Sequence, residues 1–258
     1  MRTVYGILTL LMLICFGCQW QLKPSSGGAA DNALSIQRFD RIESLYLTTG
    51  DFAALQQMNT YFPMQTRMLI EDVLQLGKVN DPAINTKFLF FFQDSTLQHM
   101  LSDVQQQYAE MDDVSEELSR AFTRLQEHLP DMEMPDVYTQ IGSFDQSIIV
   151  GNNSLGISLD KYLGSDYPFY VAHYSASQRR MMTRQMIVPD CLSFYILSLF
   201  PISHSSQQQA RDLHMGKIQW VVNSILNRKV FDNPFVSTVQ AYVKEHPTIT
   251  IRQLLQME

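Results

Sequence analysis

The chain has 258 residues, of which 45% are hydrophobic and 11% aromatic, enough for one sizeable core and too apolar for an intrinsically disordered protein. The formal net charge is −7, so the chain lacks the basic surface that nucleic-acid binding requires, and we expect no nucleic-acid partner. The three cysteines form no paired zinc-binding or redox motif.

The N-terminus, "MRTVYGILTLLMLICFGC", has the features of a bacterial lipoprotein signal. Arg2 is followed by an apolar run from Val4 to Phe16, which is signal-peptide length and too short for a comfortable membrane span. The run ends at Gly17-Cys18, the kind of junction at which a peptidase cuts before a diacylglycerol-modified cysteine. We predict a signal peptide over residues 1–17 and acylation, for example with palmitate, of Cys18. An uncleaved anchor and an ordinary secretory signal are the alternatives.

Residues 18–33 include "KPSSGGAAD" and are predicted to be a flexible tether. The first acidic residue after Cys18 is Asp31. Lipoproteins exported to the cell surface usually carry acids directly behind the cysteine, so we expect a membrane-anchored envelope protein that faces the periplasm. Residues 34–258 are predicted to form a single domain.

The apolar segment "FLFFF", residues 88–92, is expected in the core. The two segments that follow it are predicted to be helices. "DSTLQHMLSDVQQQYAEM" begins with Asp94 or Ser95 as a cap, and "DDVSEELSRAFTRLQEHLP" has acids at its positive end and Pro130 as its stop. Their helical stripes are Leu97, Leu101, Val104 and Tyr108 in the first, and Val114, Leu118, Phe122, Leu125 and Leu129 in the second.

The middle of the chain changes to short β-branched segments, "VYTQIGSF", "SIIVG" and "LGISLD". Asn152-Asn153 is a hairpin signal between the second and third. We therefore predict a small antiparallel sheet of at least three strands in a mainly helical α+β domain. "CLSFYILSLFPI" is predicted to be a buried helix that ends near Pro201, and a long helix is expected from about Ser206 to Lys229. The stripe of that long helix is Ala210, His214, Ile218, Val221 and Ile225.

The stretch "LGISLDKYLGSDYPFY", residues 155–170, is predicted to be a strand that leads into a structured turn. Asp160 is expected to cap the turn "KYLG" by accepting backbone N–H groups, and Asp166 is expected in a turn. Tyr162, Tyr167 and Tyr170 combine apolar area with a polar tip, so they either anchor the turn or meet a partner protein.

Several chemical interpretations of these residues compete with this structural one. Asp160 and Asp166 could form a carboxylate pair, and "SLDK", starting at Ser158, matches a penicillin-binding nucleophile motif without its companion motifs. His214 lies on an apolar stripe in "HMGKI", where a zincin helix would need a glutamate and a second histidine. We therefore predict no catalytic, cofactor-binding or metal-binding residue, and a buried or partly buried core role for His214.

The order and wording of several segments resemble the GldB-type gliding-motility lipoproteins of Bacteroidetes. The most specific segments are "LGISLDKYLGSDYPFY" and "MIVPD", joined by "HMGKIQWVVNSIL", "VQAYVKEHPTITIRQLLQ" and "IQRFDRIESLY". The resemblance spans residues 36–258, and a lipidation cysteine at Cys18 is typical of the family.

The resemblance implies a non-catalytic envelope protein that acts in gliding, or in an associated envelope machine, through contacts with other envelope proteins. The same family is distantly similar to predicted zinc peptidases, which implies a zincin-like fold with "HMGKI" as the remnant of the metal helix. A divergent zinc-peptidase-like hydrolase and a periplasmic ligand-binding lipoprotein therefore remain as alternative functions.

Overall fold

The computed structural model describes residues 34–202 and 208–257, and residues 34–258 form one compact unit. The predicted signal peptide, the tether and the lipidation residue Cys18 lie outside the described residues. The unit is a mainly helical α+β domain built around a four-stranded sheet, in agreement with the predicted fold class. Within the described residues, no helix combines the length and apolar character that crossing a bilayer would take.

The N-terminal half is helical after one very short strand. Its elements are β1 (Ile36–Gln37), α2 (Phe39–Thr49), α3 (Phe52–Tyr61), α4 (Pro63–Arg67), a π-helical turn η1 (Met68–Val73), α5 (Ile84–Phe91), α6 (Ser95–Gln107) and α7 (Asp112–His128).

The second half begins with the remaining strands and ends in helices. Its elements are β2 (Asp136–Gln140), β3 (Ile148–Gly151), β4 (Ser154–Ser158), η2 (Leu159–Lys161), α8 (Pro168–His173), α9 (Ala176–Arg179), η3 (Arg184–Met186), α10 (Ile187–Leu199), α11 (Gln208–Leu226), α12 (Pro234–Glu245) and α13 (Ile251–Gln256).

The predicted helices are present. α6 begins after Asp94, whose carboxylate accepts the N–H groups of Thr96 and Leu97, and α7 carries Asp112 and Asp113 in its first turn. The buried helix is α10, which ends at residue 199, two residues before Pro201. All five stripe residues predicted for α7 are buried, which is why this helix packs so closely against its neighbours.

Two details of the predicted burial were wrong. Phe88 and Phe92 are fully buried, but Phe90 is 71% exposed, because neighbours at the fourth position share a helix face and the residue between them points away. Ala210 is exposed at the start of α11, whereas Ile218, Val221 and Ile225 are buried further along.

The sheet is mixed, so the prediction of an antiparallel sheet was wrong. The strand order is β1-β2-β4-β3, in which β1, β2 and β4 are parallel and only β3 runs antiparallel to β4. The predicted hairpin at Asn152-Asn153 is present between β3 and β4. The strand that follows β2 in the sequence does not pair with it. After the loop at residues 141–147, β3 forms the edge of the sheet, and β4 then lies between β2 and β3.

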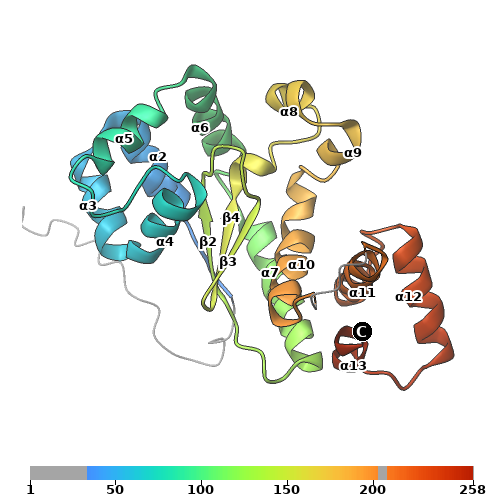
Figure 1. The fold of residues 1–258 in the computed structure, drawn as a ribbon. Coiled ribbons are helices and arrows are strands. Elements are labelled where there is room, and N and C mark those ends of the chain that lie inside the picture. Colours follow the sequence, from blue (N-terminus) through green and yellow to red (C-terminus); the bar gives the residue numbers. More distant parts are fainter. Residues whose placement is uncertain (1–33, 203–207, 258) are drawn as a thin grey trace, which may run out of the picture. The chain divides into compact units, whose positions relative to one another are not determined.

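Helices cover both faces of the sheet. Figure 1 shows α2, α3 and α4 on one side and α7 and α10 on the other, with α2 packed on β2 and α10 packed on β3 and β4. Helix α11 packs on α7 and α10, and the last two helices, α12 and α13, pack on α11. Because β1, β2 and β4 are parallel, their carboxyl ends meet at one edge of the sheet, where the chain leaves each strand.

Candidate functional site

The carboxyl edge of the parallel strands holds a cluster of buried carboxyl groups, which we call the acidic cluster. Its members are Asp40, Glu43 and Asp160, all at most 2% exposed. Asp40 and Glu43 lie on α2, directly after β1, and Asp160 follows β4. Carboxyl ends of parallel strands are the usual position of ligand sites in open α/β sheets, so this edge is the first place to look for function.

Asp160 holds the loop that follows β2. Its Oδ1 accepts the N–H of Gly142 and its Oδ2 the N–H of Phe144, each over 2.6 Å. Ser143 and Phe144 both have positive φ angles, 54° and 66°, which L-residues rarely adopt and which turn these N–H groups toward the carboxylate. Asp160 therefore caps this loop. The prediction from its sequence neighbours, that it caps the turn "KYLG", was wrong.

Two of the three tyrosines of the predicted stretch, Tyr162 and Tyr170, are buried, whereas Tyr167 is partly exposed. Tyr170 is fully buried, and its hydroxyl donates to the backbone carbonyl of Asp160 and accepts the N–H of Leu163 over 3.2 Å. Tyr162 is 1% exposed and donates to Oδ2 of Asp190 over 2.9 Å. These contacts favour anchoring over a partner surface for both residues.

Asp166 lies apart from the acidic cluster. Its side chain is 96% exposed and Oδ1 lies 3.8 Å from Nη1 of Arg179. Asp160, by contrast, is fully buried. The two aspartates thus occupy different environments and do not form the carboxylate pair that acid–base catalysis would require.

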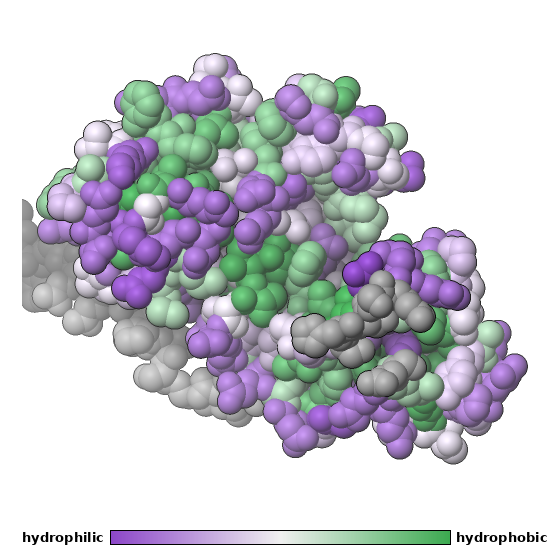
Figure 2. Space-filling model, in the orientation of Figure 1, coloured by the Kyte–Doolittle hydropathy of each residue, from purple (hydrophilic) through white to green (hydrophobic). Residues whose placement is uncertain are grey.

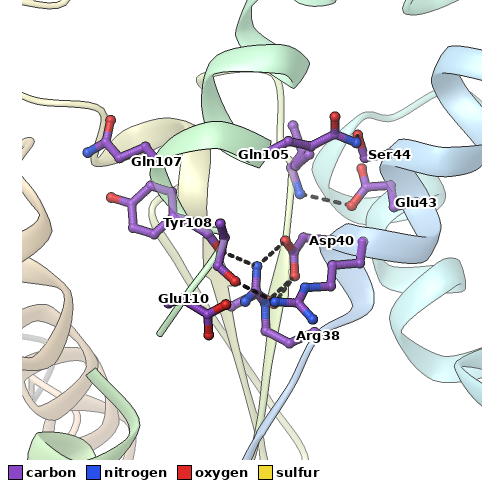
Figure 3. Close-up of polar contacts among 12 residues, drawn as sticks. Arg38, Asp40, Glu43, Ser44, Gln105, Gln107, Tyr108 and Glu110 are labelled. Carbon is purple, nitrogen blue, oxygen red and sulfur yellow. Dashed lines mark hydrogen bonds and ion pairs between the residues drawn. The ribbon is translucent and has the colours of Figure 1, made fainter. Parts of the chain in front are cut away.

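Arg38 neutralises Asp40. Figure 3 shows the guanidinium facing the carboxylate, with Nε to Oδ1 at 2.9 Å and Nη2 to Oδ2 at 2.8 Å. The same Nη2 donates to the carbonyl of Tyr108, at the end of α6, over 2.7 Å. Thr139 of β2 also donates to Oδ1 of Asp40. This bidentate pair joins three segments that are far apart in the sequence.

Glu43 is the least satisfied carboxyl of the cluster. Its Oε2 accepts the N–H of Ile141 over 2.9 Å, but its Oε1 has no hydrogen-bond partner among the described residues. Burial raises its pKa well above the usual range, and the nearby charges of Asp40 and Asp160 add to the effect. Burial therefore favours the protonated, neutral form of Glu43 over the carboxylate.

A further acid, partly buried, lies in the first turn of α10: Asp190. Burial raises the pKa of Asp190 to about 7, although the hydrogen bond from Tyr162 lowers it. Burial likewise raises the pKa of the neighbouring Cys191 thiol, which is a free cysteine inside the core. A buried, unreactive thiol of this kind is a small hydrophobic side chain, without the thiolate that catalysis needs.

The other two residues from candidate motifs, Ser158 and His214, make structural contacts. Ser158 is fully buried at the end of β4, where its hydroxyl accepts from the amide of Gln140 over 3.3 Å. It precedes only the three-residue 3₁₀ turn η2 and not the longer helix that the nucleophile motif requires. His214 is partly buried, and its Nε2 lies 2.8 Å from the carbonyl of Phe200, which agrees with the predicted structural role.

The chemistry of the acidic cluster is that of a scaffold. The carboxyl groups meet backbone N–H groups, one guanidinium and one threonine hydroxyl. Among residues 34–202 and 208–257, no three His, Cys, Asp or Glu side chains form a group that could hold a metal ion. A surface pocket of about 460 Å³ lies elsewhere, between α6 and α8, and is lined by Asp103, Gln106, Gln107, Tyr167 and Pro168.

Sequence reasoning missed Arg38, Glu43 and Asp190. For Glu43 a signal was present, because it lies four residues after Phe39 and four before Leu47, on the buried stripe of α2. A glutamate on an apolar stripe needs a partner in the core. For Arg38 the pairing with Asp40 is local, but its second partner, the carbonyl of Tyr108, comes from a distant segment and leaves no local signal.

These features define a helix-covered α+β domain with a buried polar scaffold. The chain belongs to the family of the gliding motility protein GldB, whose family model matches residues 22–231. The predicted resemblance is thereby confirmed. Comparison with curated proteins and with solved structures found no match for this chain.

Proposed function

We propose that the protein is a lipid-anchored component of the cell envelope that acts through protein contacts, in gliding or in an associated envelope machine. The observation that carries this proposal is membership of the gliding-motility family over residues 22–231. The lipoprotein signal that ends at Cys18 supports the anchor, and the distance of Asp31 from this cysteine supports a periplasmic orientation.

The acidic cluster supports a role that depends on shape rather than on chemistry. Asp160 shapes the loop at residues 142–144, and Arg38 links β1 to the end of α6. Such cross-links fix the relative positions of segments that approach the surface. A protein that works as a docking platform needs this rigidity, because a mobile surface binds at an entropic cost.

The anchor is tested by replacing Cys18. One acyl chain gives only marginal membrane binding, so a diacylglycerol with two chains should hold the protein stably. We expect Cys18→Ala to abolish incorporation of labelled palmitate and to leave the protein uncleaved or in the soluble fraction. Cells that carry only this variant should lose the family's motility or envelope phenotype. An unmodified Cys18 in the mature protein would refute the anchor.

The non-catalytic part of the proposal is tested separately. We expect the purified full-length protein to contain no stoichiometric zinc and His214→Leu to fold normally, because the ring only contacts a backbone carbonyl. Stoichiometric zinc that is lost in His214→Leu would favour the peptidase-like alternative. Co-purification of one small molecule with the protein would favour a ligand-binding lipoprotein instead.

A further inference from the structure

The outer side of β3 is a free edge of the sheet. β3 pairs only with β4, and its position at the end of the order β1-β2-β4-β3 leaves its other side without a strand. The opposite edge is different, because β1 contributes only two residues. β3 is thus the one edge of the described sheet at which several residues offer backbone groups outward.

The pairing register identifies which groups are free. The N–H of Ser158 donates to the carbonyl of Ser147 over 2.9 Å, so this pair is hydrogen-bonded. Bonded and non-bonded pairs alternate along an antiparallel ladder, so Ile149 and Gly151 bond to β4 while Ile148 and Val150 face outward. Neither of these outward residues has a backbone partner within the described part of the chain.

This edge lacks the usual protection. Natural edge strands carry a charged residue, a proline or a bulge that blocks pairing with another chain, but β3 reads Ile-Ile-Val-Gly. The surroundings are also apolar. α10 packs against β3 and has Phe194 39% exposed, and Figure 2 shows a hydrophobic strip where Figure 1 places β3. Ile148 and Ile149 are 6% and 7% exposed, whereas Val150 and Gly151 are partly exposed, so the edge is most accessible to an extended chain at its hairpin end.

We propose that β3 takes up an extended segment of an envelope partner protein as an additional strand. This inference rests on the proposed function and names the surface through which it operates. The free N–H and C=O groups of Ile148 and Val150 select a strand, because only an extended backbone matches their spacing. The segment should have alternating apolar residues and basic flanks, since exposed Asp145 precedes β3 and Asp136 lies beside the hairpin turn.

A second copy of the chain fits this edge less well. Four residues of strand span only about 13 Å, so pairing along this edge alone makes a small contact, whereas a stable dimer buries roughly 800 Å² per partner. Two copies, each with a formal charge of −7, would also repel one another. A short peptide segment gains its backbone hydrogen bonds without needing so large an interface.

A defined peptide tests the proposal in solution. The probe is a fluorescent peptide of alternating valine and threonine with a lysine at each end, added to the detergent-solubilised full-length protein. We expect saturable binding by fluorescence anisotropy and slower hydrogen exchange at Ile148 and Val150. Val150→Pro removes one outward N–H, so it should weaken binding at least about tenfold. The matched control Val150→Thr keeps this N–H and should bind like the parent.

A change in the peptide gives a test that does not depend on how the variants fold. N-methylation of alternate residues removes the hydrogen-bond donors from one side of the peptide, and it should abolish binding to the parent protein. Absence of binding by the parent, or equal binding of the methylated peptide or by Val150→Pro, would overturn the proposal. A dimer that dissociates in Val150→Pro would do the same, because it would assign the edge to a second copy.

Experiments in cells distinguish the proposed envelope function from the proposed strand pairing at β3. Cys18→Ala tests the anchored envelope role, whereas Val150→Pro leaves the anchor intact. If Val150→Pro is membrane-bound, folded and fully functional, the edge proposal fails while the envelope role stands. If both variants and a complete deletion leave motility and envelope behaviour unchanged, the proposed function itself fails. We expect loss of function in both variants and normal function in Val150→Thr.

Discussion

The polar groups at the carboxyl edge of the sheet have hydrogen-bond partners within the protein, whereas the backbone groups on the outer side of β3 do not. At the carboxyl edge, Asp160 and Asp40 are buried and almost every oxygen has a partner. At the β3 edge, the backbone groups of Ile148 and Val150 have none within the described residues. Buried polar groups must be satisfied internally, whereas unpaired groups at an edge can be satisfied by another chain. The first edge therefore supports the fold, and the second is where function should be sought.

The largest expected effect is at Asp160. Its replacement by alanine leaves two buried N–H groups, those of Gly142 and Phe144, without an acceptor, at about 1–3 kcal/mol each. Part of this loss is offset because a buried carboxyl is removed, so we expect Asp160→Ala to lower the free energy of unfolding by about 3 kcal/mol in denaturant titrations.

Asp166→Ala is the matched control for Asp160→Ala. Its side chain is 96% exposed, so the free energy of unfolding should change by less than about 0.5 kcal/mol. A loss of only about 1 kcal/mol for Asp160→Ala, typical of an exposed cap, would mean that the loop relaxes and does not depend on this carboxylate.

Tyr170→Phe should have the next largest effect. The hydroxyl bridges the carbonyl of Asp160 and the N–H of Leu163 inside the core, so its removal leaves both groups unpaired. We expect a loss of about 2 kcal/mol in the free energy of unfolding. Tyr167→Phe is the comparison, because its hydroxyl meets Asp103 at the surface pocket and should contribute less. Equal losses for both would argue against a special role for the buried anchor.

The third prediction concerns pH. The pKa of Asp190 is raised to about 7, so the folded state keeps a proton that the unfolded chain releases near pH 4, and stability falls as pH rises between these values. Asp190→Asn cannot ionise but still accepts from Tyr162. Between about pH 5 and about pH 8 the parent should lose about 2 kcal/mol more than this variant.

The raised pKa values of Glu43 and Asp160 act in the same direction as that of Asp190. The Asp190→Asn variant should therefore still lose some stability with rising pH, although less than the parent does. Thermal unfolding of both proteins across this pH range gives the comparison. Parallel curves for the parent and Asp190→Asn would show that Asp190 does not carry the predicted shift.

The parts of this structure that could be predicted from the sequence are those set by near neighbours. The periodicity of α7, the Asp94 cap of α6 and the Asn152-Asn153 hairpin each depend on residues within about one or two turns. Strand order, the partner of Asp160 and the Arg38–Asp40–Tyr108 contact depend on which distant segments meet. A local pattern contains no information about that, so these features were missed or assigned to a sequence neighbour.

A small predicted loss of stability at Val150 gives the sharpest test of the comparison between the two edges. Val150→Pro removes an N–H that has no partner within the described residues, so it should lower the free energy of unfolding by less than about 1 kcal/mol. Ile149→Pro, one residue earlier, removes an N–H that pairs with β4 and should cost about 3 kcal/mol or more. Denaturant unfolding of both variants measures the difference. If Val150→Pro is as damaging as Ile149→Pro, the outward side of β3 is already engaged by the protein itself, and the edge is not free for a partner.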